Sequence, residues 1–131
     1  MKILIKFTIA LIFLFTLSFS AQNKTWLDAD FKETNKEKSI YYKVTSNDKK
    51  EITFFYKSGK VLKNIAFING ELNGFFSEFY ESGEVKTLGQ YKNGLEEGVW
   101  KTYYKNGKNK EKGRYKNGEK VGVWKTFYKN F

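Results

Sequence analysis

Residues 89–107 read GQYKNGLEEGVWKTYYKNG, and residues 113–131 read GRYKNGEKVGVWKTFYKNF. The two stretches align without a gap at a spacing of 24 residues, and residues 67–83 form an earlier copy with Phe75-Phe76 in place of Val-Trp. All eleven glycines of the chain fall on four phases of this period: 59, 83 and 107; 70, 94 and 118; 74, 98 and 122; 89 and 113. A fixed period of this length indicates a repeat architecture in which each copy packs on the next.

Each copy predicts two short strands joined by a tight turn. Asn69-Gly70, Asn93-Gly94 and Asn117-Gly118 are the strongest hairpin signals, because Asn and Gly both tolerate positive φ. The flanking segments are rich in Val, Thr and aromatic residues, which favour strands. We therefore predict an all-β fold, an antiparallel β-hairpin repeat array with a 24-residue period over residues 51–131.

Aromatic side chains follow the same period. Alternation along a strand places Trp100, Thr102 and Tyr104 on one face, and the next copy repeats this set as Trp124, Thr126 and Tyr128. Side chains of neighbouring copies then stack as a ladder. We expect this ladder to be the core, with burial of both Trp100 and Trp124; an aromatic ligand-binding strip is the alternative.

The run from Gly89 through Gly98-Val99-Trp100 to Gly107, and its copy from Gly113 to Tyr128, resembles the MORN repeat variant of proteins grouped as the YwqK-type antitoxin family of toxin–antitoxin systems. The resemblance covers about residues 52–131. It implies an array of β-hairpins that acts as an interaction scaffold, with lipids or partner proteins as ligands. The antitoxin grouping implies that the chain binds and neutralises a toxin protein.

The composition excludes most catalytic and metal chemistry. The chain has no Cys and no His, so it lacks thiol nucleophiles, Ser–His catalysis, disulfides and the usual zinc ligands. Asp28 and Asp30 alone provide too few oxygen ligands for calcium. Glu96 and Glu97 are the only candidate acid–base pair, but adjacent residues on a strand point apart. We expect no enzyme activity, no cofactor and no metal.

The first 21 residues have the three parts of a secretory signal peptide. A basic start containing Lys2 and Lys6 precedes an apolar run over residues 7–19, and small residues follow at Ser18, Ser20 and Ala21. Since a spanning helix needs about 20 apolar residues, this run is too short for one. We expect cleavage after Ser20 or Ala21, export to the periplasm or beyond the cell, and no transmembrane segment in the mature chain.

Residues 22–50 do not follow the period and are expected to form an N-terminal cap segment. Residues 40–44 and 51–56 read as two strands around the polar loop 45–50, a degenerate first hairpin. We expect Trp26, Leu27 and Phe31 to pack over this hairpin. One strand face, with Leu62, Ala66 and Ile68, is apolar and calls for such a cover.

Positive charge is concentrated at one end of the array. Residues 22–90 carry eleven basic and ten acidic groups, whereas residues 91–131 carry eleven basic and four acidic groups, a net charge of +7. Every second residue is basic in one strand, which predicts a candidate anion- or partner-binding face: Lys108, Lys110, Lys112, Arg114 and Lys116.

Two interpretations of this basic strand stay open. It docks on anionic lipid headgroups, envelope polysaccharide or an acidic protein partner, with nucleic acid a weaker candidate for an exported chain. Alternatively, it is a solvated face whose lysines protect the sheet from aggregation.

Overall fold

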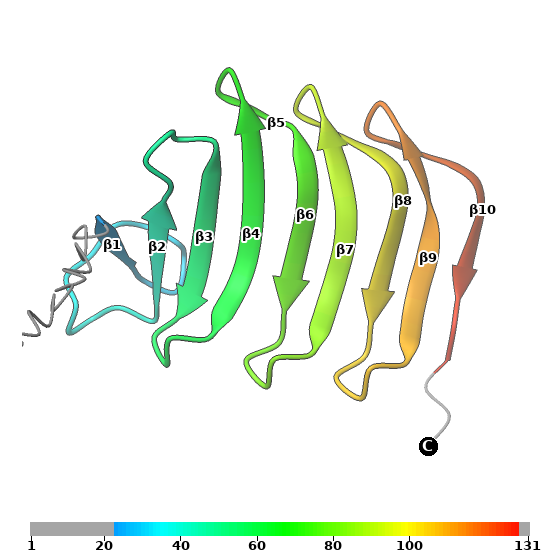
Figure 1. The fold of residues 1–131 in the computed structure, drawn as a ribbon. Helices are drawn as coiled ribbons and strands as arrows, with labels where there is room; N and C mark the ends of the chain where they lie inside the picture. Colours follow the sequence, from blue (N-terminus) through cyan, green and yellow to red (C-terminus); the bar gives the residue numbers. More distant parts are fainter. Residues whose placement is uncertain (1–22, 129–131) are drawn as a thin grey trace, which may run out of the picture.

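The computed structural model describes residues 23–128, which form one antiparallel sheet (Figure 1). The strands follow one another across the sheet in the order β1-β2-β3-β4-β6-β7-β8-β9-β10, and the short β5 pairs with β4 outside this path. The strands are β1 (Lys24–Leu27), β2 (Tyr41–Thr45), β3 (Glu51–Tyr56), β4 (Val61–Ile68), β5 (Glu71–Leu72), β6 (Gly74–Phe79), β7 (Val85–Lys92), β8 (Leu95–Tyr103), β9 (Asn109–Lys116) and β10 (Glu119–Thr126). The predicted all-β hairpin array is confirmed. The signal peptide predicted for residues 1–21 lies outside the described residues.

The predicted Asn-Gly turns close the hairpins at one end of the strands. Asn93 and Gly94 have φ of 50° and 80°, and Asn117 and Gly118 have φ of 50° and 81°. Positive φ at both central residues is the signature of a type I′ turn, whose twist matches that of the strands it joins. A second set of turns lies at the opposite end of the strands. There the Gly83 N–H donates to the carbonyl of Tyr80, and the Gly107 N–H donates to the carbonyl of Tyr104. The turn chemistry therefore accounts for the meander.

A bulge recurs in the second strand of the two C-terminal repeats. Leu88 pairs with Lys101 and Gln90 with Glu97, so the single residue Gly89 faces three residues of β8. The same shift recurs in β10 around Gly122, at the level of Gly113. The bulged segment places its tryptophan directly over the glycine of the preceding strand, Trp100 over Gly89 and Trp124 over Gly113. The approach is so close that a Cβ at either glycine would overlap the indole ring.

The aromatic ladder runs along one face of the sheet. Ring centroids of successive members lie 5.0–5.8 Å apart, in stacked and edge-to-face pairs: Phe76, Tyr91, Trp100, Tyr115 and Trp124. Trp100 is 8% exposed, as predicted. In the last copy Trp124 is less completely buried than Trp100, and Tyr128 is 85% exposed. Among the described residues, no strand beyond β10 covers them.

The N-terminal cap differs from its prediction in one respect. Trp26 and Leu27 lie in β1, which adds to the sheet by pairing with β2. The Trp26 ring does pack on the first hairpin, 5.3 Å from the ring of Tyr42, but it does so from the neighbouring strand. Phe31 does cover this hairpin, with its ring 4.8 Å from that of Tyr41 and 6.0 Å from that of Phe54. Leu27 is fully buried, since the segment after it folds back through a bridge to Glu33.

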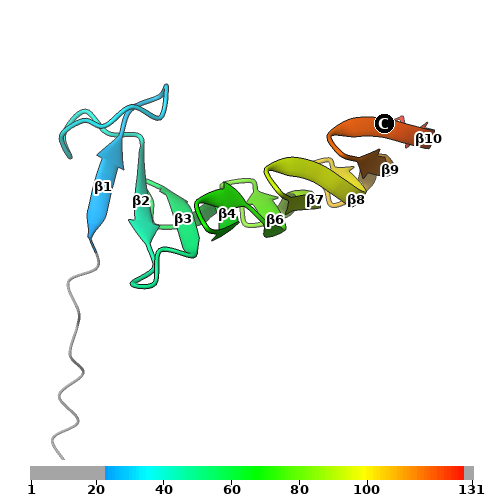
Figure 2. The same ribbon diagram turned by 90° about the horizontal axis from the view of Figure 1, so that it is seen from above.

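The apolar face expected under this cover is only partly enclosed. Leu62 is buried and Ala66 is half-buried, but Ile68 remains 55% exposed. Seen from above, strands β4 to β10 form a single layer (Figure 2), so both faces of the repeats are open to solvent. Within residues 23–128 no helix has the length and apolar character needed to cross a membrane.

Candidate binding face

The face of the sheet opposite the aromatic ladder carries the basic residues of β9. Gly113 and Tyr115 lie on the ladder side, since they pair or stack with Trp100. Lys112, Arg114 and Lys116 alternate with them and are exposed. We call this side the open face.

The predicted five-residue stripe is shorter in the structure. Lys112, Arg114 and Lys116 lie in the regular part of β9, but Lys110 lies at a register shift between the pairs Thr102–Glu111 and Tyr103–Asn109. Lys108 precedes the strand. All five side chains are exposed, yet strict alternation holds only for the last three, because the shift breaks the two-residue period.

Two lysines outside the predicted stripe complete a row across the sheet. Lys112 pairs with Lys101 of β8 on one side and with Lys125 of β10 on the other. Neighbouring strands lie about 4.8 Å apart, so the three side chains leave the same face in close succession. We call Lys101, Lys112 and Lys125 the cation row. Lys101 and Lys125 share one phase of the 24-residue period, which is the sequence signal that could have revealed them.

No ion pair among the described residues involves the cation row. By contrast, cations on the ladder face have acidic partners: Lys86 Nζ lies 2.8 Å from Glu78 Oε1, and Lys120 Nζ lies 3.2 Å from Glu111 Oε1. The hydrogen bond to Glu78 raises the pKa of Lys86. Within residues 23–128, the cation row therefore has no acidic partner at ion-pair distance, whereas Lys86 and Lys120 on the ladder face each have one.

Exposed apolar side chains lie beside the cation row. Val99 and Val121 flank Arg114 in register, and both are more than one third exposed. Phe75 in β6 and Val123 in the bulged segment of β10 are 82% and 80% exposed. We call Phe75, Val99, Val121 and Val123 the apolar lane. In the sequence Phe75 only replaces the Val of later copies, and nothing in that pattern indicates its exposure.

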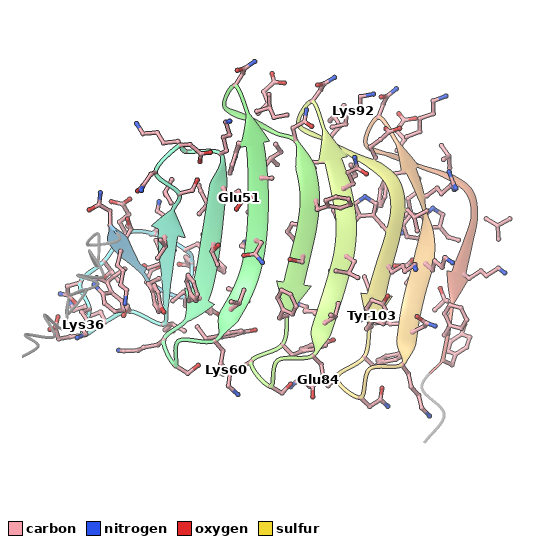
Figure 3. All side chains as sticks on the ribbon, viewed as in Figure 1. Lys36, Glu51, Lys60, Glu84, Lys92 and Tyr103 are labelled. Atoms are coloured by element: carbon pink, nitrogen blue, oxygen red, sulfur yellow. The ribbon has the colours of Figure 1, made fainter. Side chains whose placement is uncertain are left out.

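Two shallow grooves combine these two sets of residues. One of about 570 Å³ is lined by Phe75, Leu88, Val99 and Lys101, among others. A second of about 300 Å³ is lined by Val99, Arg114, Val123 and Lys125 together with their neighbours. Figure 3 shows that Lys60 and Glu84 lie at the turns at one end of the strands and that Lys92 lies near the other end. All three are away from the middle of the strands. The centre of the open face is thus apolar and cationic.

The acidic groups near this face are not arranged for catalysis. Glu96 pairs with Tyr91 on the ladder side, whereas Glu97 pairs with Gln90 on the open side. Glu97 Oε2 accepts a hydrogen bond from the backbone N–H of Asn117, which ties it to a turn. Within the described part of the chain, no three acidic side chains gather in a way that would hold a metal ion.

Comparison with known families agrees with the repeat. The family model of the MORN repeat variant matches residues 72–93 and 96–117, so each match runs from one Asn-Gly turn to the next. These segments are MORN-variant repeats, and repeats of this type are generally non-catalytic modules that bind proteins or membranes. No curated protein matches the chain.

Proposed function

We propose that the chain is an exported, non-catalytic binding module that docks on an anionic partner through the open face of its C-terminal repeats. The cation row supports this proposal most directly. Lys101, Lys112 and Lys125 occupy laterally paired positions, where like charges destabilise a sheet. An anionic partner offsets this repulsion, whereas a purely structural face gains nothing from it.

The partner belongs to the cell envelope and is anionic: an acidic protein, lipid headgroups or acidic polysaccharide. This choice depends on the predicted signal peptide, because an exported chain meets these polyanions first. Each cation near an anionic membrane surface contributes on the order of 1 kcal/mol. A row of three lysines with Arg114 and Lys116 beside it therefore supports reversible, salt-sensitive docking.

The test is a comparison of two triple variants with equal change in net charge. Lys101→Glu, Lys112→Glu and Lys125→Glu together should abolish binding to anionic vesicles and to acidic polysaccharide at low salt. Lys32→Glu, Lys38→Glu and Lys60→Glu together should preserve it, since these exposed lysines lie outside the open face. Binding by the parent should also weaken steeply with salt, because the Debye length falls from about 10 Å at 0.1 M to about 3 Å at 1 M.

Equal loss in both triple variants would show that net charge alone drives binding. If the parent binds no anionic probe at low salt, the proposal is wrong, and the lysines only keep the sheet soluble.

An antitoxin-type function is the alternative, in which the same face binds and neutralises a toxin protein. The motif from Gly89 to Gly107 favours it, since it resembles the repeats of antitoxin-grouped proteins. Coexpression with the product of a neighbouring gene is the test. Relief of growth arrest by the parent, but not by the cation-row variant, would support this alternative.

A further inference from the structure

Two parallel lines of side chains cross the strands of the open face. The apolar lane runs from Phe75 in β6 through Val99 in β8 to Val121 and Val123 in β10. The cation row runs beside it, from β8 to β10. Arg114 lies between Val99 and Val121, and Lys112 follows two residues away along β9. The apolar lane and the cation row are therefore about 6.7 Å apart along the strands.

This spacing sets the dimensions of an occupant. From β6 to β10 the lane crosses four strand intervals, about 19 Å at about 4.8 Å each. An α-helix is about 10–12 Å wide with its side chains and rises 1.5 Å per residue, so about 13 residues cover both lines over this length. One turn of such a helix advances 5.4 Å, close to the interval between neighbouring lysines of the cation row.

We propose that the partner on the open face is an acidic amphipathic α-helix of another protein, lying across strands β6 to β10. Its apolar stripe packs on Phe75, Val99 and Val123, and carboxylates on one flank meet the cation row. Acidic residues three or four positions apart share one flank of a helix, so successive turns face successive lysines. This inference rests on the proposed function, because it identifies the anionic partner of the same face.

Other occupants fit the two lines less well. An extended peptide turns successive side chains to opposite sides, so it cannot place an apolar line and an acidic line next to each other on one surface. A flat bilayer reaches the protruding Phe75 and Val123, which are 82% and 80% exposed, before it reaches Val99 and Val121, which are only 38% and 37% exposed beside the longer lysines. A helix places apolar side chains of different length on one flank and carboxylates on the other, so it contacts both the apolar lane and the cation row.

The probe is a fluorescein-labelled 14-residue peptide with Leu at helical spacing and four Glu on one flank. A scrambled peptide of the same composition removes the apolar stripe but keeps the charge. With protein purified from its host, fluorescence anisotropy should show at least tenfold tighter binding of the designed peptide at about 0.1 M salt. Circular dichroism should show a gain of helix in the mixture beyond the sum of the two components.

Variants of the chain separate the two lines. Phe75→Ser and Val123→Ser together should weaken binding of the designed peptide at least fivefold without altering the fold, since both side chains are more than three quarters exposed. Ile68→Ser is the matched control, because Ile68 is an exposed apolar residue outside the lane. Lys112→Glu should weaken binding of both peptides.

Three outcomes would overturn the inference, and they differ from failure of the proposed function. Equal affinity for the designed and scrambled peptides means that charge alone is recognised. Equal affinity of the Ile68→Ser and Phe75→Ser/Val123→Ser variants for the designed peptide excludes the apolar lane. Loss of binding to anionic vesicles in the Phe75→Ser/Val123→Ser variant, with no preference between peptides, identifies a membrane as the occupant. Absence of binding to every anionic probe would instead contradict the proposed function itself.

Discussion

Gly89 and Gly113 lie directly beneath the indole rings of Trp100 and Trp124. Neither glycine has a positive φ, so the backbone does not require glycine at either position. The requirement is steric, because any Cβ would collide with the ring. In contrast, Gly94 and Gly118 lie in type I′ turns with positive φ, and a Cβ at Gly94 would meet no neighbouring atom. Two kinds of glycine therefore maintain the repeat.

Alanine substitution should distinguish these two roles. Gly94→Ala should cost about 1–2 kcal/mol of unfolding free energy through backbone strain alone. Gly89→Ala should cost about 1–3 kcal/mol because it overpacks the site. Only the cost at Gly89 should fall when Trp100 is already Ala, which urea denaturation of the single and double variants measures. Additive costs for Gly89→Ala and Trp100→Ala would contradict the steric explanation.

The two ladder tryptophans should differ in stability and fluorescence. Trp100 is buried between neighbouring repeats, so Trp100→Ala should cost roughly 3–5 kcal/mol. Trp124→Ala should cost less, because Trp124 is less buried than Trp100 and lies in the last strand, where it packs on one side only. Emission of Trp100 should be blue-shifted and resist quenching by acrylamide. Neutral replacement of Trp100 would favour the aromatic binding strip over the core.

At the scale of the elements, one tyrosine in each repeat links it to the next. The hydroxyls of Tyr56, Tyr80 and Tyr104 donate to the carbonyls of Phe79, Tyr103 and Phe127, at 2.9, 2.8 and 2.9 Å. Each bond joins residues 23 positions apart, and it links the end of the second strand of one hairpin to the end of the second strand of the next. These strand ends lie beside the turns that contain Gly83 and Gly107. These hydrogen bonds couple successive repeats in addition to the strand ladder and the aromatic contacts.

Tyr80→Phe should therefore destabilise the sheet by about 1 kcal/mol, the usual net contribution of one hydrogen bond. Tyr128→Phe is the control within the same column, since Tyr128 is 85% exposed. Thermal unfolding of the two variants gives the comparison. A cost at position 128 equal to that at position 80 would show that the hydroxyl acts through solvation and not through the inter-repeat bond.

At the scale of the whole molecule, the repeats form one layer with two different faces. On the ladder face Lys86 and Lys120 pair with Glu78 and Glu111, whereas no acidic side chain among residues 23–128 forms an ion pair with the cation row. The export predicted from residues 1–21 also concerns the whole chain, because it would determine which polyanions the open face meets.

Material from the native host should have an intact mass that begins at Ala21 or Gln22, because the small residues of the predicted cleavage site lie there. Mass spectrometry of the purified protein tests this directly. Retention of Met1 would contradict processing and would favour the antitoxin-type alternative within the cell.

The sequence by itself determined the 24-residue period, the Asn-Gly turns and the all-β meander, because turn chemistry and strand alternation are local. It also located the excess of positive charge near residues 108–116. Only the tertiary structure decided which residues lie side by side across strands. The bulges at Gly98 and Gly122 shift the register by two residues, and the shift near Lys110 shortens the predicted stripe. Lateral neighbours depend on that register, which joins residues distant in sequence, so the row of Lys101, Lys112 and Lys125 appears only once the strands are paired.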